Sequence, residues 1–159
     1  MKRWSLRRKA TVGIIASFIL QVLPLPVMLG WFRPSFAVLA VIYWSLTAPG
    51  FGGVGLGFLV GLALDAYLGV VLGQHALATA LVAYIAIRQH LIIRNKPIFE
   101  QTLYVGGLLL LWESVIWAIN GWTGHAIGGW LRLLPVITGT LLWPFLIDWL
   151  GSDPARSRR

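Results

Sequence analysis

Only a few charged residues of this sequence stand among its apolar stretches, and these are the first candidates for chemistry. Asp65 and Glu113 each lie between apolar residues, and Arg33 and Arg132 separate apolar runs. At membrane depth a carboxylate costs about 3 kcal/mol unless it has a partner, a watery cavity or a proton. Two carboxylates that met could act as a general acid and a general base. A carboxylate that met an arginine would form an ion pair or a polar binding site.

Arg33 and Arg132 are the candidate partners of Asp65, because all three fall toward the outer end of the protein in the topology derived below. Two interpretations of Asp65 stay open: a polar site that receives a partner or a ligand, and a structural pair that locks helices together. Glu113 poses the same question, and nothing in the sequence places it beside Asp65. His75 follows at the outer turn and is the fifth residue of this candidate polar site.

Signatures of catalysis and of metal binding are missing from the sequence. There is no cysteine, no set of His, Asp and Glu with metal-ligand spacing, no phosphate-binding loop ending in Lys-Ser or Lys-Thr, no HExxH and no GxSxG. Gly55, Gly57 and Gly61 form a GxGxxxG run, but it lies within an apolar stretch and not after a strand, so a nucleotide-binding loop is excluded. We expect a protein without catalytic residues, metal or cofactor.

Composition assigns the chain to the membrane class. Of its 159 residues, 58% are hydrophobic and 11% are charged, which leaves too few polar groups to cover a surface that faces water. A net charge of +8 could indicate nucleic acid, but the basic residues stand at the ends of apolar stretches. They are better explained as residues that fix the topology and contact lipid headgroups, so no nucleic-acid partner is expected.

The sequence predicts an all-α bundle of six transmembrane helices with both termini inside. A helical span needs about 20 apolar residues. The basic N-terminus and the basic loop at 88–96 should both be cytoplasmic, which requires an even number of spans before that loop. Residues 34–71 must then hold two helices, separated at Pro49-Gly50, because proline and glycine together end a helix. The expected spans are about 11–30, 35–48, 52–70, 72–88, 101–120 and 131–149.

Charge and tryptophan placement agree with this topology. Arg33 and Arg132 lie outside, whereas eleven basic residues lie inside: Lys2, Arg3, Arg7, Arg8, Lys9, Arg88, Arg94, Lys96, Arg156, Arg158 and Arg159. Five tryptophans fall near the two boundaries, where indoles anchor membrane proteins: Trp4 and Trp149 inside, and Trp31, Trp122 and Trp130 outside.

The chain then divides into a basic cytoplasmic segment at 1–10, a transmembrane domain at 11–150 and a basic cytoplasmic tail at 151–159. The basic start followed by an apolar run is also typical of a signal peptide. That run is longer than a usual signal-peptide core, and no small-x-small cleavage site follows it, so we expect an uncleaved first span.

A glycine repeat marks the third predicted helix. Every fourth position from 53 to 73 is glycine except Asp65. Residues spaced by four lie nearly above one another on a helix, and in lipid such smooth faces let helices approach closely. The groove could serve packing inside the bundle or contact with another protein, and the two are compatible. Its members are Gly53, Gly57, Gly61, Gly69 and Gly73.

Two elements of the sequence resemble a known family. One is Arg33-Pro34-Ser35-Phe36 with Tyr43-Trp44 and Pro49, and the other is Gly61-Leu62 and Asp65 with Leu72-Gly73-Gln74-His75-Ala76-Leu77. Over about residues 30–105 these elements resemble the MreD family of rod shape-determining proteins. The rest of the chain agrees mainly in length and hydropathy.

The resemblance implies a non-catalytic scaffold or regulator in the bacterial inner membrane. Its implied direct partner is MreC, in a complex with MreB, RodA and a class B penicillin-binding protein that guides lateral peptidoglycan synthesis and rod shape. The family is also similar in fold to the S components of energy-coupling-factor transporters, which have six helices. This similarity supplies the alternative function: a small-molecule-binding transporter subunit with a polar cavity around Asp65 and Arg33.

Overall fold

Six α-helices and one short 3-10 helix make up the regular structure of the described residues. The computed structural model describes residues 2–23, 32–124 and 129–151. Within these ranges the expected all-α bundle of six helices is confirmed. The elements are α1 (Lys2–Val22), α3 (Phe36–Thr47), α4 (Val54–Leu68), α5 (Gln74–Ile93), α6 (Ile98–Trp122), η1 (Trp130–Leu133) and α7 (Leu134–Gly151).

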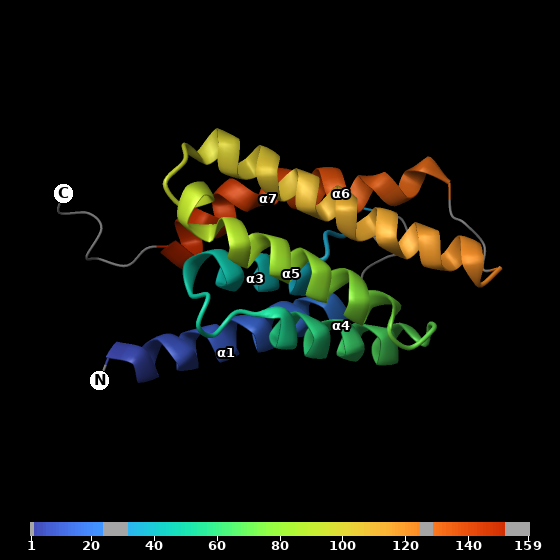
Figure 1. The fold of residues 1–159 in the computed structure, drawn as a ribbon, viewed down its shortest axis with the longest axis horizontal. Helices are drawn as coiled ribbons and strands as arrows, with labels where there is room; N and C mark the ends of the chain where they lie inside the picture. Colours follow the sequence, from blue (N-terminus) through green and yellow to red (C-terminus); the bar gives the residue numbers. More distant parts are fainter. Residues whose placement is uncertain (1, 24–31, 125–128, 152–159) are drawn as a thin grey trace.

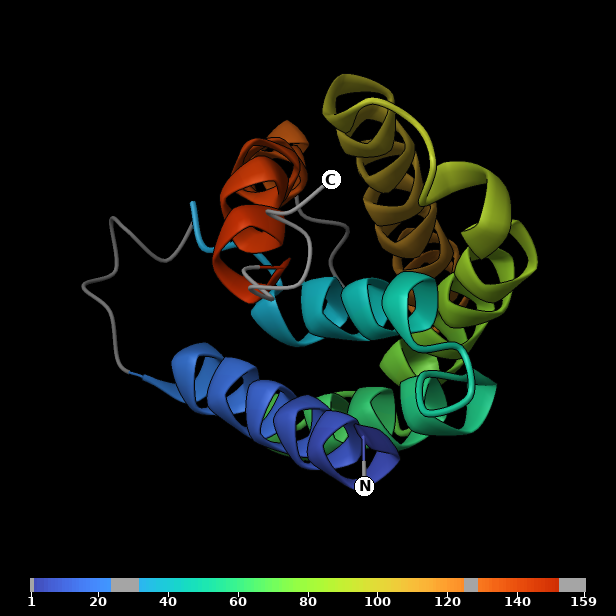
Figure 2. The same ribbon diagram turned by 90° about the vertical axis from the view of Figure 1, so that its left-hand side faces the viewer.

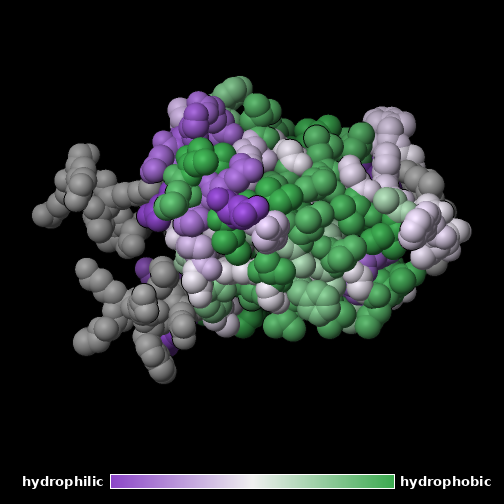
Figure 3. All heavy atoms as spheres, viewed as in Figure 1, coloured by the Kyte–Doolittle hydropathy of each residue, from purple (hydrophilic) through white to green (hydrophobic). Residues whose placement is uncertain are grey.

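Successive helices run in opposite directions along the long axis, so α1 begins and α7 ends at the same end of the bundle (Figure 1). On the face shown in Figure 3, hydrophilic residues gather at this end and hydrophobic residues cover the middle. Among the described segments, α5, α6 and Trp130–Asp148 are long and apolar enough to cross a membrane, while α3 and α4 are apolar but shorter. The described residues therefore form a helical bundle with the lengths and composition of a membrane protein.

Some helix ends differ from the expected spans where polar residues continue a helix. α1 begins at Lys2 rather than near residue 11, because lysine and arginine are good helix formers and do not stop a helix where its apolar run stops. α5 likewise continues to Ile93. Residues 24–31 of the chain and 152–159 of the expected tail lie outside the described residues.

α3 occupies the centre of the bundle. It is apolar on all sides, and its residues from Ala37 to Leu46 are all buried. The end-on view shows α3 in the middle of the other helices (Figure 2), and it contacts α1, α4, α5 and α7. A helix that is hydrophobic all round is stable where neighbours cover it. This position explains how a helix of only 12 residues can belong to the bundle.

A tight turn separates α3 from α4 at residues 48–53. The amides of Phe51 and Gly52 donate to the carbonyl oxygen of Ala48 at 2.9 and 2.8 Å. A Cβ atom at Gly52 would stand 2.6 Å from the backbone of Trp44, so only glycine fits this close approach. Residues 34–71 thus hold two helices with a turn after Pro49.

The glycine face of α4 packs directly on the backbone of α5. A Cβ atom at Gly57 would stand 2.8 Å from the carbonyl oxygen of Thr79, and one at Gly61 would stand 2.5 Å from the Cα atom of Ala76. Backbone atoms of a packed helix cannot turn aside as a flexible side chain can. Glycine at these two positions therefore lets the two helices meet, as small residues do between membrane helices.

A second contact between small residues joins α6 to α7. A Cβ atom at Gly106 would stand 3.0 Å from Oγ1 of Thr140, and one at Gly139 would stand 2.9 Å from a methyl carbon of Leu109. Neither glycine belongs to a four-residue repeat, so the sequence pattern did not single out this contact. It holds α7 against the rest of the bundle.

Replacing Gly61 by alanine should destabilise the protein, because the added methyl group would overlap the backbone of α5. We expect the free energy of unfolding to fall by about 1–3 kcal/mol, the usual cost of overpacking. Thermal or denaturant unfolding in detergent measures this loss.

Gly55 provides the matched control, since it lies on the same helix and no described atom of a neighbour comes within 4 Å of its Cβ position. Gly55→Ala should leave stability unchanged or raise it by up to about 1 kcal/mol through helix propensity. Equal losses in Gly55→Ala and Gly61→Ala would contradict the packing argument.

Candidate functional site

Asp65 holds the polar site together, at the end of the bundle opposite the start of α1, which we call the far end. Its carboxylate is fully buried near the end of α4. Oδ2 accepts hydrogen bonds from the amides of Gly73 and Ala76, at 2.8 and 3.2 Å. Oδ1 accepts from the amide and from Nδ1 of His75, at 2.9 and 2.8 Å. Four donors therefore converge on one carboxylate.

These backbone donors lie at the beginning of α5, where amides have no partner within the helix. The remaining amides of this first turn also have partners: Gln74 donates to the carbonyl of Val71 at 3.3 Å, and Leu77 donates to that of Gly73 at 2.8 Å. A negative charge at a helix N-terminus also interacts favourably with the helix dipole. Asp65 of α4 is thus the cap of the neighbouring helix α5.

Two glycines shape the turn that brings the start of α5 back to Asp65. Gly69 ends α4 with a φ of 63°, and Gly73 precedes α5 with a φ of 105°. Both values lie in a region that side chains rarely adopt. Gly69 and Gly73 therefore serve the turn, whereas Gly57 and Gly61 serve the helix contact. A Cβ atom at Gly53, just before α4, would stand 4.0 Å from the side chain of Ile87.

His75 links the Asp65 cap to α6. We assign a proton to Nδ1, because this nitrogen lies 2.8 Å from Oδ1 of Asp65, and Nε2 of a neutral ring is then an acceptor. The imidazole ring lies against the ring of Trp112, with centroids 5.5 Å apart. Nε1 of Trp112 donates in turn to Oγ1 of Thr79 at 3.0 Å. These contacts tie α4, α5 and α6 together at the far end.

Glu113 and Arg132 form a second polar pair at the far end. Nε of Arg132 lies 3.4 Å from Oε1 of Glu113, and Glu113 is only 7% exposed. The pair joins α6 to η1, just before α7. Arg132 therefore neutralises Glu113, while the carboxylate of Asp65 is held by His75 and backbone amides.

Arg33 lies at the junction of α1 and α3. Its guanidinium donates to the carbonyl oxygen of Leu20 in the last turn of α1, where the helix dipole favours a positive charge. Beside it, Oε1 of Gln21 accepts a hydrogen bond from the amide of Phe36 at 3.0 Å, which caps the start of α3. The structure thus gives Asp65 a different partner from the two arginines that the sequence offered.

This arrangement joins helices and leaves few polar atoms for other chemistry. Asp65 and Glu113 belong to separate pairs, so they do not form an acid and base together. Across the described ranges, no three His, Cys, Asp or Glu side chains gather as a metal site requires. Four buried polar atoms at the far end have no hydrogen-bond partner among the described residues: Nε of Arg33, Oε1 of Gln74, Nε1 of Trp117 and Nη1 of Arg132. They are the atoms through which this site could still contact a ligand.

Sequence reasoning missed Gln21, Thr79 and Trp112, which support the polar groups. The pairing of Asp65 with His75 did leave a signal: Asp65, Gly69 and Gly73 are spaced by four, and a glycine turn after a helix returns the chain to that helix. The indole and the threonine hydroxyl meet across 33 positions of the sequence, and no local pattern could indicate that contact.

Comparison with known proteins identifies relatives over most of the chain. Residues 8–152 match the family model described as rod shape-determining protein MreD. The chain is also 32% identical over 132 residues to the protein named Rod shape-determining protein MreD of Haemophilus influenzae, which covers 83% of this chain and 82% of that protein. No solved structure matches this chain significantly. The matched region runs from α1 to α7 and contains both polar pairs.

Replacing Asp65 by asparagine should destabilise the bundle, because an amide group cannot accept from four donors and turns its own N–H groups toward backbone amides. We expect the free energy of unfolding to fall by about 1–3 kcal/mol, the cost of leaving buried donors without an acceptor. Thermal unfolding in detergent measures the change.

Glu100→Gln is the matched control, since it makes the same chemical change at a half-exposed carboxylate paired with Lys96. A pair of this kind contributes about 0–1 kcal/mol. A loss in Asp65→Asn no larger than in Glu100→Gln would mean that the cap does not stabilise the fold.

Proposed function

Because this chain belongs to the MreD family of rod shape-determining proteins, we propose that it is a non-catalytic scaffold of the bacterial inner membrane. In this role it crosses the membrane several times and binds MreC directly. Together they support MreB, RodA and a class B penicillin-binding protein in lateral peptidoglycan synthesis. The family match over residues 8–152 carries the proposal.

The geometry of the polar groups supports a scaffold. Asp65 and Glu113 have partners inside the bundle, and hydrophobic residues cover the middle of the molecule (Figure 3). The described connections between helices are short, so a partner must be met on a helix face or at one end of the bundle. A scaffold needs a rigid surface of this kind more than it needs a polar cavity.

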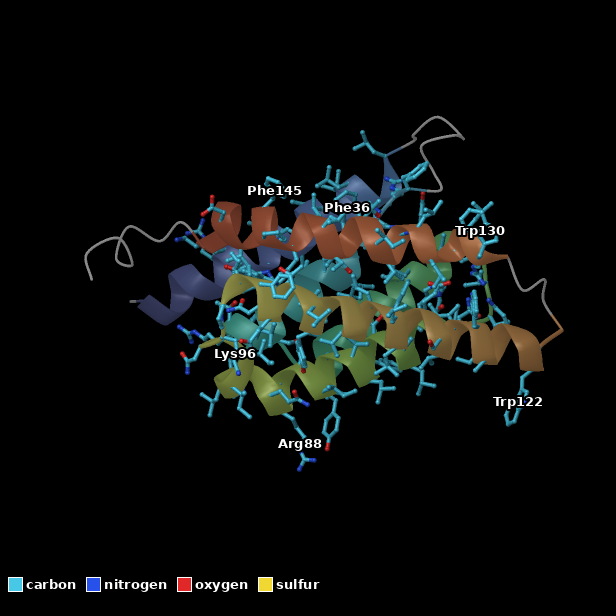
Figure 4. All side chains as sticks on the ribbon, turned by 90° about the horizontal axis from the view of Figure 1, so that it is seen from above. Phe36, Arg88, Lys96, Trp122, Trp130 and Phe145 are labelled. Carbon is cyan, nitrogen blue, oxygen red and sulfur yellow. The ribbon has the colours of Figure 1, made fainter. Side chains whose placement is uncertain are left out.

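We further propose that the far end faces the outside of the cell. The basic residues at the other end then lie in the cytoplasm, as the positive-inside rule requires. Trp122 and Trp130 are 96% and 72% exposed and lie near the far end (Figure 4), at a level that suits interfacial anchors. Trp31 lies outside the described residues, as do the side chains of Trp4 and Trp149.

The alternative, a transporter subunit that binds a small molecule, has one observation in its favour. The partnerless Oε1 of Gln74 and Nη1 of Arg132 are buried at the far end. Against it, the two carboxylates that could line a cavity are occupied by neighbours. The two functions therefore differ in what the protein retains when it is isolated.

Isolation of the tagged protein from native membranes in mild detergent should recover MreC and the cell-wall synthesis enzymes, without a stoichiometric small molecule. Mass spectrometry of both proteins and small molecules makes the comparison. A tagged polytopic membrane protein of similar size controls for unspecific capture. In a rod-shaped strain that lacks its own MreD, the chain should restore rod shape. Recovery of a defined small molecule with the ATPase and coupling subunits of a transporter would replace the scaffold by the alternative.

A further inference from the structure

The buried sides of α5 and α6 change from apolar to polar at the far end. On α5, Ala78 and Val82 are fully buried, and Gln74, one turn before Ala78, is only 4% exposed. On α6, Leu109 is buried against α7, and Glu113 follows one turn later. Buried polar side chains in folded proteins normally have hydrogen-bond partners. Polar atoms at this level that lack a partner are therefore candidates for contact with a ligand.

Three of the four unpartnered polar atoms of the far end belong to neighbouring elements. They are buried and have no hydrogen-bond partner among the described residues: Oε1 of Gln74, Nε1 of Trp117 and Nη1 of Arg132. Arg132 contacts Glu113 through Nε at 3.4 Å, and Trp117 lies one turn beyond Glu113 on the same side of α6. The charge of Arg132 also acts on His75, the neighbour of Gln74. The three atoms thus border one region between α5, α6 and η1.

α3, which fills the middle of the bundle (Figure 2), does not extend to this level. A Cβ atom at Gly139 would stand 3.6 Å from Cβ of Pro34, just before α3 begins. Gly139 lies five residues after the start of α7 at Leu134, which is about 8 Å along the helix. Arg132 lies farther still toward the far end. The region beside its guanidinium is therefore not filled by α3.

Arg132 lies near the level of a membrane surface. It is two residues from Trp130 in η1, or about 4 Å along a 3-10 helix. Trp122 and Trp130 are exposed near the far end (Figure 4), where indoles mark the interface between lipid and water. The headgroup region on each side of a bilayer is about 5–8 Å thick. The phosphates of lipids in the adjacent leaflet are therefore within reach of Arg132.

The three atoms have the chemistry of a site for a phosphate-bearing headgroup. A guanidinium presents N–H donors in a fork that matches the oxygens of a phosphate, and the indole N–H of Trp117 is a further donor. Glu113 is bound through Nε, so it orients the guanidinium while Nη1 stays unpaired. Oε1 of Gln74 is an acceptor and suits a headgroup that carries a hydroxyl or ammonium donor.

We propose that Arg132 and Trp117 bind the phosphate of a phospholipid from the adjacent leaflet, and that Gln74 accepts a hydrogen bond from the rest of its headgroup. This binding site goes beyond the scaffold function proposed above and does not depend on it. The lipid comes from the membrane itself and is distinct from the small molecule that a transporter subunit would retain.

Thermal unfolding of the full-length protein in detergent tests the site with dioctanoyl-phosphatidylglycerol as the probe. A ligand that binds only the folded protein raises Tm with its concentration, and a concentration series gives Kd. Dioctanoylglycerol has the same chains without the phosphate, and glycerol 3-phosphate has the phosphate without the chains. Phosphatidylglycerol should raise Tm, and the other two should not.

The comparison of the three probes distinguishes the sources of the phosphate. No rise in Tm with phosphatidylglycerol, or an equal rise with dioctanoylglycerol, would overturn the proposal. An equal rise with glycerol 3-phosphate would replace the phospholipid by a soluble phosphate compound.

Trp117→Phe tests the indole donor, because it removes one N–H group and keeps an aromatic ring. Since this N–H has no described partner within the protein, the change should not lower Tm without lipid. Kd for phosphatidylglycerol should rise about three- to tenfold, the effect of one hydrogen bond. Trp122→Phe is the matched control, since it makes the same change at an indole that is 96% exposed, and it should leave Kd unchanged. Equal rises in Kd would mean interfacial contact rather than a site.

Gln74→Met and Arg132→Lys test the other two groups. Gln74→Met keeps the length of the side chain without its amide, so Kd should rise about three- to tenfold. Arg132→Lys keeps a charge opposite Glu113 but loses the fork, so Kd should rise about ten- to hundredfold. Unchanged Kd in both variants would overturn the proposal. A lower Tm without lipid, together with unchanged Kd, would show that these side chains serve packing alone.

Discussion

The far end of the bundle depends on one buried carboxylate. Asp65 accepts from three amides of α5 and from the imidazole of His75, so the end of α4 and the beginning of α5 are fixed to the same group. Because His75 and Ala76 are buried, an uncapped helix start there would leave buried amides without acceptors. The same contact orients His75 toward Trp112 and so helps to position α6. An aspartate that looks costly as an isolated charge thus satisfies the backbone of its neighbour.

The glycine repeat and the aspartate act as parts of one face. α4 and α5 run in opposite directions, and successive positions of the repeat meet successively earlier parts of α5. Gly57 faces Thr79, Gly61 faces Ala76, and Asp65 reaches Gly73 just before the helix begins. Where α5 has a backbone to pack against, the repeat has glycine. Where α5 begins and offers amides, the repeat has a carboxylate.

Much of the fold could be predicted from the placement of charged residues in the sequence, whereas most contacts of the candidate site could not. The positive-inside rule required two helices within residues 34–71, and the turn that Gly52 permits is where proline and glycine indicated it. The same rule misdirected the search for partners of Asp65, because it drew attention to the arginines expected at the outer end. Arg33 instead donates to the end of α1, and Arg132 pairs with Glu113. The sequence does not show which backbone amides lack an acceptor. A carboxylate that binds such amides therefore cannot be matched to a partner by residue type.

The distribution of polar partners says where a scaffold of this kind can act. At the far end, the carboxylates of Asp65 and Glu113 are enclosed by neighbours of the same chain, so their charges stabilise contacts between helices of the fold. Since the described connections between helices are short, a lateral helix face offers a partner more surface than they do. Recognition by a scaffold of this kind is therefore directed to the side of the bundle and away from its buried polar groups.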